Sequence, residues 1–366
     1  MQLSYRQKAV LTSVFVFLMV ILILGLAEGA VQLRQWLKYG HFGHYEDLFV
    51  VDEGTGLRVL AANAASRTIN INSQGFRGPP ITQPKPAGDL RLAFLGASTT
   101  FCAEVSGDEL TWPHLVTEAV QEAVHDINVD YVNGAMPGYV VQSSLHNLSE
   151  RIAPFQPDVV VIYHATNDLS QETRWLAVKQ GIYEEEGRSV KKSWLAKHSL
   201  LWYLVEKNLH LKAVQRNAVD AKKRLEFSPS KLGVQFRKEL TQLVLAAKQI
   251  SGVVALATFS YQIRPEQTPE QQLVAASSAL YYMPFMTLNG LVEAYTQYNQ
   301  IIADVARDTG AILIDVETAI PGDSKHFNDT VHFTDAGSLV MAHRVSEAVL
   351  ASAEFQALVK AKRGGN

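Results

Sequence analysis

Beyond residue 89, short apolar segments alternate with longer amphipathic ones. The apolar segments have the length of strands, and the segments between them repeat apolar residues at the spacing of a helix. We expect strands at 91–95, 130–132, 159–163, 253–257 and 311–315, with helices at 112–125, 142–153, 234–250, 291–309 and 336–360. This alternation predicts an α/β fold, a doubly wound, mostly parallel sheet with helices on both faces in three layers. A ligand of such a sheet lies at the carboxyl ends of the strands.

A run of 19 apolar or uncharged residues, 9–27, stands near the start of the chain. As a helix with a rise of 1.5 Å per residue, it would span roughly the hydrocarbon core of a bilayer. Arg6 and Lys8 precede the run, so the positive-inside rule predicts a cytoplasmic N-terminus and an extracytoplasmic domain, periplasmic in a Gram-negative cell. The alternative is a cleaved signal peptide, because the small residues Ala27 and Ala30 follow.

The sequence divides into three parts: a tail and transmembrane anchor at 1–30, a linker with small strands at 31–88, and the main domain at 89–366. The alternation breaks at 170–230, which predicts a helical insertion. Its segment 188–224 holds ten Lys and Arg residues against two acidic ones. An insertion at this place is suited to cover a site, and its charge favours anionic lipid or glycan. The alternative is a solvated helical hairpin packed on the domain.

Charge and cysteine content exclude several classes of function. The chain has 33 Lys and Arg against 36 Asp and Glu, a net charge of −3, which argues against a dedicated nucleic-acid-binding protein. The single cysteine, Cys102, excludes an intramolecular disulfide and any multi-thiolate metal site. No two histidines have the spacing of a zinc site on one helix, and we expect neither a metal nor another cofactor.

Two segments far apart in the sequence carry the parts of a nucleophilic site. Ser98 follows the first strand in a turn of small residues, where its hydroxyl would lie at the carboxyl edge of the sheet. Asp329 and His332 stand three residues apart before a predicted helix, so the carboxylate can orient the imidazole while its second nitrogen faces the serine. Each segment alone is also compatible with a structural role, a helix cap or a hydrogen-bonded loop.

Two further blocks follow the second and third predicted strands. Gly138 lets a backbone N–H approach a substrate closely, and Asn167 supplies an uncharged side-chain donor. Both suit an oxyanion hole, although the same residue types also form ordinary turns. Thr99, His164 and Asp168 adjoin these blocks and are candidates for the wall of the pocket; His164 can equally be a structural residue at the end of a buried strand.

In order and spacing, these four blocks resemble the SGNH branch of the GDSL-type hydrolases, from about Arg91 to Val349. The resemblance implies that Ser98 is the nucleophile, His332 the general base and Asp329 its partner. It also implies that the oxyanion hole consists of the Ser98 N–H, Gly138 and Asn167.

The chain departs from the family pattern at two positions. Ala97 replaces the usual aspartate before the serine, and Ala165 replaces the usual glycine of the third block. Neither position carries a proton in the implied chemistry. The two changes therefore put in doubt the geometry of the loops and the rate of the reaction, and not the role of Ser98. The segment 72–78 resembles, more loosely, the stretch before the hydrolase domain in membrane-tethered bacterial members.

The resemblance implies a membrane-anchored serine esterase that cleaves an O-acyl ester, on an extracytoplasmic polysaccharide or glycan. An O-acyltransferase on the same substrates shares the first half-reaction, and a lipid esterase also fits a tethered domain. A catalytically silent scaffold that binds glycan or a partner protein is an alternative of another class. The expected partners are the ester substrate and the membrane, with no nucleic acid, and the sequence specifies no protein partner.

Overall fold

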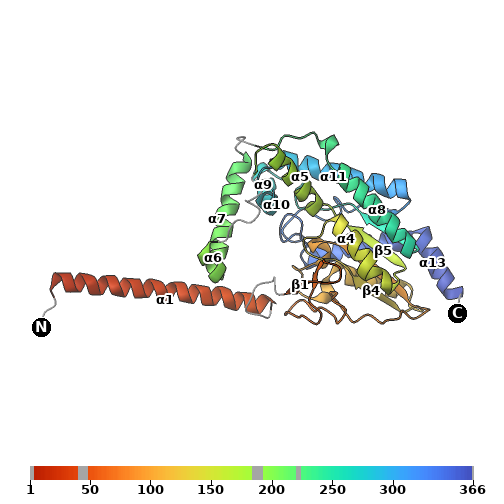
Figure 1. The fold of residues 1–366 in the computed structure, drawn as a ribbon, viewed down its shortest axis with the longest axis horizontal. Coiled ribbons are helices and arrows are strands. Elements are labelled where there is room, and N and C mark those ends of the chain that lie inside the picture. The colour runs from red at the N-terminus through yellow and green to blue at the C-terminus, as the bar shows by residue number, and fades with distance from the viewer. Residues whose placement is uncertain (1–3, 40–47, 184–192, 220–223, 365–366) are drawn as a thin grey trace.

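The computed structural model describes residues 4–39, 48–183, 193–219 and 224–364, so parts of the basic segment 188–224 lie outside the described residues. A five-stranded sheet in the order β4-β3-β5-β6-β7 forms the centre of the main domain (Figure 1). Every strand pair is parallel. The strands are β3 Leu90–Gly96, β4 Val129–Asn133, β5 Val159–Tyr163, β6 Val253–Ala257 and β7 Ile312–Ile314. Each ends within one residue of its predicted limits, and the predicted α/β fold is confirmed.

Helices cover both faces of this sheet. The helices between and after the strands are α3 Trp112–Ala123, α4 Val141–Asn147, α8 Val234–Ile250, α11 Leu288–Thr309, α12 Asp335–Ala351 and α13 Ala353–Gly364. Helix α3 contacts α12, whereas α8 contacts α4 and α11. Right-handed crossovers require this division, because the chain moves one way from β3 to β4 and the other way from β4 onward. Strands β3, β5 and β6 are buried along their whole length, as a sheet with two covered faces demands.

Two predicted helices are less regular than expected. The segment 142–153 is α4 followed by a π-helical turn, Leu148–Ile152. The closing helix is two helices, because Ser352 adopts an extended conformation and its Oγ accepts the N–H of Phe355 at 3.3 Å. A serine in this position begins a new helix rather than continuing the old one.

The insertion between β5 and β6 contains α5 Thr166–Lys179, α6 Trp194–His198 and α7 Leu200–Val219. We call residues 193–219, which comprise α6 and α7, the arm. Two short helices that the sequence reading missed, α9 Pro269–Ala275 and α10 Ser277–Tyr282, follow β6. The inner side of the arm packs on α10, where the rings of His210 and Tyr281 meet edge to face at 4.9 Å.

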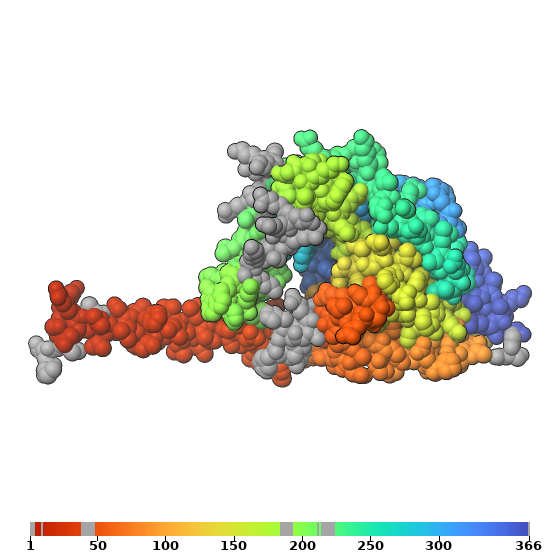
Figure 2. Space-filling model, viewed as in Figure 1, coloured from red at the N-terminus to blue at the C-terminus, as the bar shows by residue number. Residues whose placement is uncertain are grey.

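Helix α1, Tyr5–Tyr39, extends away from the domain (Figures 1 and 2). By length and composition, 5–37 could cross a membrane, and a signal sequence would have the same character. The side chains of its apolar part are exposed, for example Phe15 at 64% and Ile23 at 57%. Exposure of this kind is costly in water and is normal for a helix surrounded by lipid.

The segment before the main domain packs against the start of that domain. Strands β1 Phe49–Val51 and β2 Arg58–Leu60 form an antiparallel pair. Farther along, the buried guanidinium of Arg77 pairs with Asp108 at 2.7 Å and donates to the carbonyls of Phe101 and Cys102, both at 2.7 Å. Both carbonyls lie at the end of α2, Ser98–Phe101, so this linker residue supports the helix that begins with Ser98.

Candidate active site

Ser98 is the first residue of α2, just beyond the carboxyl end of β3, an interior strand of the sheet. The turn between them requires Gly96, because a Cβ there would lie 2.1 Å from the Thr100 hydroxyl and 2.8 Å from the Tyr163 carbonyl oxygen. Ala97 caps α2 through its backbone, since its carbonyl accepts the N–H groups of Thr100 and Phe101. This turn leaves Ser98 half-buried at the edge of the sheet.

The structure brings Ser98, His332 and Asp329 into one hydrogen-bonded line. The Ser98 Oγ lies 2.7 Å from His332 Nε2. On the other side of the ring, His332 Nδ1 lies 2.9 Å from Asp329 Oδ2 and 3.0 Å from Oδ1. An Nδ1–H that donates to the carboxylate leaves Nε2 as the acceptor for the serine hydroxyl proton.

Asp329 and His332 each stabilise the charged form of the other. Burial alone would raise the pKa of the Asp329 carboxyl, but His332 and the backbone N–H groups of Val331 and His332 outweigh it and lower that pKa to about 2. Burial likewise disfavours the charged imidazole, yet the Asp329 carboxylate, helped by Glu104, raises the pKa of His332 above its ordinary value. The pair is therefore suited to hold a proton taken from Ser98.

The Asp329–His332 loop is held from the α9–α10 side. Thr330 is buried, and its hydroxyl donates to the Ala275 carbonyl at 2.6 Å. Its backbone N–H donates to the Ser278 hydroxyl at 3.2 Å, and its carbonyl accepts the N–H of Gln262 at 2.8 Å. Both short helices thus fix the residue that follows Asp329.

A second clamp joins the segments that carry Ser98 and His332. The Asp335 carboxylate, in the first turn of α12, accepts the Ser106 N–H at 2.8 Å and the Ser106 hydroxyl at 2.7 Å. Our sequence reading missed Asp335 and Glu104. An acidic residue at the start of a helix was a visible signal for the first, whereas nothing local pointed to the second.

Gly138 lies in the loop after β4, and Asn167 lies in the first turn of α5, which follows β5; β4 and β5 are the two neighbours of β3. Gly138 has a φ of +88°, which favours glycine, and it is exposed. The Asn167 amide donates to the Tyr139 carbonyl at 2.9 Å, which joins the loop after β4 to the start of α5. Ser98, Gly138 and Asn167 therefore belong to three adjacent strand ends, and the second proton of the Asn167 amide is available to another acceptor.

Thr99, His164 and Asp168 lie beneath this surface. All three are buried, with exposures of 2%, 3% and 7%. His164 Nε2 lies 2.8 Å from the Ser144 hydroxyl, and burial lowers the pKa of His164 to about 3. Burial also raises the pKa of Asp168 to about 7, while its Oδ1 accepts the N–H of Val141 at 2.9 Å. Little of their side-chain surface is exposed, and His164 and Asp168 contact residues of α4.

A hollow in the surface lies away from Ser98, His332 and Asp329. A hollow of about 440 Å³ opens beside the amino ends of β3 and β4, lined by Asp89, Asn128 and Lys362 among others, at the edge opposite Ser98. Within the described ranges, no three His, Cys, Asp or Glu side chains are placed to hold a metal ion.

Comparison with solved structures finds hydrolases of low identity. One is Axe2, an acetylxylan esterase from Geobacillus stearothermophilus, at 17% identity and a TM-score of 0.42, with 71% of this chain and 93% of that chain covered. Another is LAE5, described as an alpha/beta hydrolase enzyme from the metagenome of Lake Arreo, Spain, at 14% identity and a TM-score of 0.41, with 71% and 94% covered. No curated protein matches the chain.

Comparison with family models is decisive for membership. The model of the GDSL-like lipase/acylhydrolase family matches residues 94–340, about two thirds of the chain. This match includes the Ser98 turn, both middle blocks and the Asp329–His332 loop. The protein therefore belongs to the GDSL-like lipase/acylhydrolase family and is a serine ester hydrolase.

Proposed function

We propose that this protein is a membrane-anchored esterase in which Ser98 attacks an O-acyl ester on an extracytoplasmic polysaccharide or glycan. The observation that supports it most is the continuous contact from Ser98 Oγ to His332 Nε2, at 2.7 Å, and from His332 Nδ1 to Asp329, at 2.9 Å. A serine hydroxyl is a weak nucleophile unless a base removes its proton, and this arrangement supplies that base.

In the first half-reaction, His332 Nε2 takes the Ser98 proton as Oγ bonds to the acyl carbon. The negative charge that develops on the acyl oxygen is stabilised by the N–H groups of Ser98 and Gly138 and by the Asn167 amide. The intermediate then collapses, the alcohol oxygen leaves with the proton from His332, and the acyl group stays on Ser98. Asp329 stabilises the imidazolium throughout.

In the second half-reaction, His332 removes a proton from water, whose oxygen attacks the acyl carbon. The Ser98 Oγ leaves with that proton from His332, and the free acid is released. A sugar hydroxyl in place of water would make the same enzyme an O-acyltransferase. The acceptor therefore decides between the two reactions.

The anchor in this proposal is α1, with its N-terminus in the cytoplasm. Arg6 and Lys8 stand before the apolar part, and the exposed apolar side chains of the helix are those of a bilayer span. The domain then lies outside the membrane, where acylated polysaccharide and glycan are within its reach. This location supports the choice of substrate class.

A covalent probe tests the nucleophile directly. We expect a fluorophosphonate to label the full-length protein in detergent and to leave Ser98→Ala unlabelled, with Ser73→Ala, an exposed serine of the linker, labelled like wild type. Labelling that persists in Ser98→Ala would assign the nucleophile to another serine.

A product analysis then tests the substrate class. The full-length protein is incubated with O-acetylated glycans, with simple acyl esters and with lysophospholipid. Free acid from the glycans supports the proposal, a newly acylated glycan shows transfer, and release of fatty acid alone shows a lipid esterase.

A further inference from the structure

The outer side of the arm carries an exposed apolar stripe. On α7, Trp202, Val205 and Leu209 are 40%, 37% and 62% exposed, and their spacing of three and four residues puts them on one face. Trp194 and Leu195 of α6 are 71% and 47% exposed. Single exposed apolar residues are common on proteins, but a stripe along α7 with two more exposed apolar residues on the neighbouring α6 marks an interaction surface.

The inner side of the same helix is already occupied. His210, which packs edge to face on Tyr281 of α10, lies on a different side of α7 from Trp202 and Leu209. Helix α10 in turn binds the catalytic loop, because the Ser278 hydroxyl donates to the Thr330 hydroxyl at 3.0 Å. The arm is therefore fixed to the domain by one side, close to Asp329, and its apolar stripe is on the side that α10 does not cover.

Hydrogen bonds to α1 fix the position along that helix at which α7 begins. The Glu28 carboxylate accepts the Ser199 hydroxyl at 2.7 Å and the N–H groups of Leu200 and Leu201 at 3.0 and 2.9 Å. These N–H groups belong to the first turn of α7, where a carboxylate is stabilising. Glu28 is the residue directly after the apolar run 9–27, so α7 starts where that run ends.

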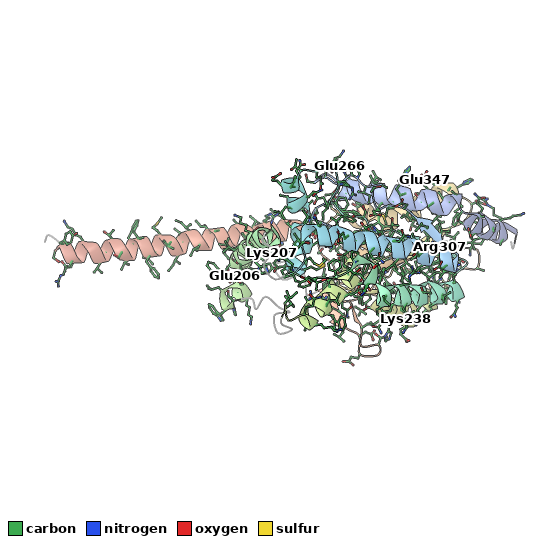
Figure 3. The ribbon with its side chains drawn as sticks, turned by 90° about the horizontal axis from the view of Figure 1, so that it is seen from above. Glu206, Lys207, Lys238, Glu266, Arg307 and Glu347 are labelled. Atoms are coloured by element: carbon green, nitrogen blue, oxygen red, sulfur yellow. The ribbon has the colours of Figure 1, made fainter. Side chains whose placement is uncertain are left out.

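The direction of the arm follows from two views. Helix α7 runs across the axis of α1 in Figure 1, and in Figure 3, which looks down from above, α7 is seen nearly end-on over the domain-proximal part of α1. A helix that crosses a membrane-spanning helix at the end of its apolar run lies along the membrane surface.

The composition of the arm fits this position. The arm carries four Lys and Arg residues against the single acidic residue Glu206, and Lys212 is exposed one turn beyond Leu209. Tryptophan is enriched at the boundary between lipid and water, and lysine there meets anionic headgroups.

We infer that the arm lies on the outer surface of the phospholipid bilayer, with Trp202, Val205 and Leu209 among the headgroups and Lys212 against anionic lipid. This inference rests on the membrane anchor of the proposed function. With α1 as one attachment and the arm as a second, the domain has a fixed height and orientation, and the α10 side of the site is close to the lipid surface.

Fluorescent labels on introduced thiols test this contact. Val205→Cys reports on the arm, Val16→Cys on the anchor, and Val234→Cys, a 71% exposed position on α8, serves as the matched control. The native Cys102 is buried, and burial raises the pKa of its thiol to about 11, so the wild-type protein serves as the unlabelled blank. Each full-length variant is reconstituted into vesicles of phosphatidylcholine and phosphatidylglycerol, with and without brominated chains.

We expect brominated lipid to remove most of the emission at positions 16 and 205 and to leave position 234 unchanged. Quenching at 16 without quenching at 205 would retain the anchor and overturn the inference. A blue-shifted label at 205 that brominated lipid does not quench would mean that protein covers the stripe, which also overturns it. Absence of quenching at 16 would refute the anchor and the inference with it, while the Ser98 labelling experiment would still test the chemistry separately.

Discussion

The chain contains two Asp-x-x-His turns six residues apart, and they fold alike. In the first turn, Asp323 Oδ1 accepts the backbone N–H of His326 at 3.0 Å and lies 2.7 Å from its Nδ1. In the second, Asp329 Oδ1 accepts the backbone N–H of His332 at 3.0 Å and lies 3.0 Å from its Nδ1. The spacing alone therefore produces a carboxylate–imidazole pair.

The two turns differ in what surrounds them. The second presents Nε2 to Ser98, and its carboxylate is 28% exposed. The first has a carboxylate that is 55% exposed, and the carbonyl of His326 accepts the N–H of Thr334 at 3.0 Å beside the start of α12. A local motif thus makes the pair, and the tertiary position of β3 gives only one pair a serine.

The largest expected effect separates the two histidines. We predict that His332→Ala lowers kcat about 10⁴- to 10⁶-fold, because the serine loses its base, and that Ser98→Ala does the same. His326→Ala should stay near wild type. Initial rates on an activated acyl ester measure this, with circular dichroism to verify folding, and equal losses in both histidine variants would refute the distinction.

Substitution of Asp329 should lower kcat far more than substitution of Asp323, as for the two histidines. Asp329→Asn keeps the shape but removes the charge that stabilises the imidazolium, and we expect a loss of about 10³- to 10⁴-fold in kcat. Asp323→Asn is the matched control and should change kcat little. A comparable loss in the control would mean that the first turn also takes part in the chemistry.

An intermediate effect is expected from Asn167, in the first turn of α5. Asn167→Ala removes one of the proposed oxyanion donors and should lower kcat about 10²-fold, with a much smaller change in KM. Asn128→Ala, at the amino end of the sheet, is the control. A change in KM alone would assign Asn167 to substrate binding instead.

A stability effect should reveal the structural part played by the first turn. A Cβ on Gly337 would lie 2.0 Å from the His326 carbonyl oxygen, so Gly337→Ala should lower the free energy of unfolding by about 1–3 kcal/mol. Gly252→Ala, whose Cβ would have no neighbour closer than 3.9 Å, should be nearly neutral. Urea unfolding measures both, and equal stability of the two variants would contradict the close contact.

The smallest effect concerns pH. Because Asp329 raises the pKa of His332, wild-type kcat/KM should fall as the pH drops through a value above the ordinary histidine pKa of about 6.5. In Asp329→Asn that pKa falls, so the acidic limb of the residual activity should move to lower pH. The limb of Asp323→Asn should coincide with that of wild type; a limb that moves there would disprove the assignment to His332.

The sheet was predictable because its signal is local. Val159–Tyr163 is five apolar residues in a row, and burial on both faces of a parallel sheet demands just that pattern. Helix α9 was missed although Thr268 and Gln271 form a capping box, a signal that is present in the sequence. The break at Ser352 was missed for a similar reason, since a serine cap inside an apolar pattern is easily passed over.

The supports of the candidate site could not be predicted, because they join residues far apart in the chain. Arg77, which supports the helix that begins with Ser98, meets Asp108 across 31 positions. Ser106 and Asp335 are separated by 229. No spacing rule connects such pairs; only the folded sheet brings them together.

The strand order β4-β3-β5 has a consequence for how this enzyme can vary. The proposed reacting groups need only the carboxyl ends of the adjacent strands β4, β3 and β5, the first turn of α5 and the loop before α12, while the rest of the connection from β5 to β6 carries the arm and α8. Extra chain can be accommodated in that connection without altering the turn that holds the serine. Evolution can therefore change where the hydrolase is stationed in the cell while the atoms that break the ester stay in place.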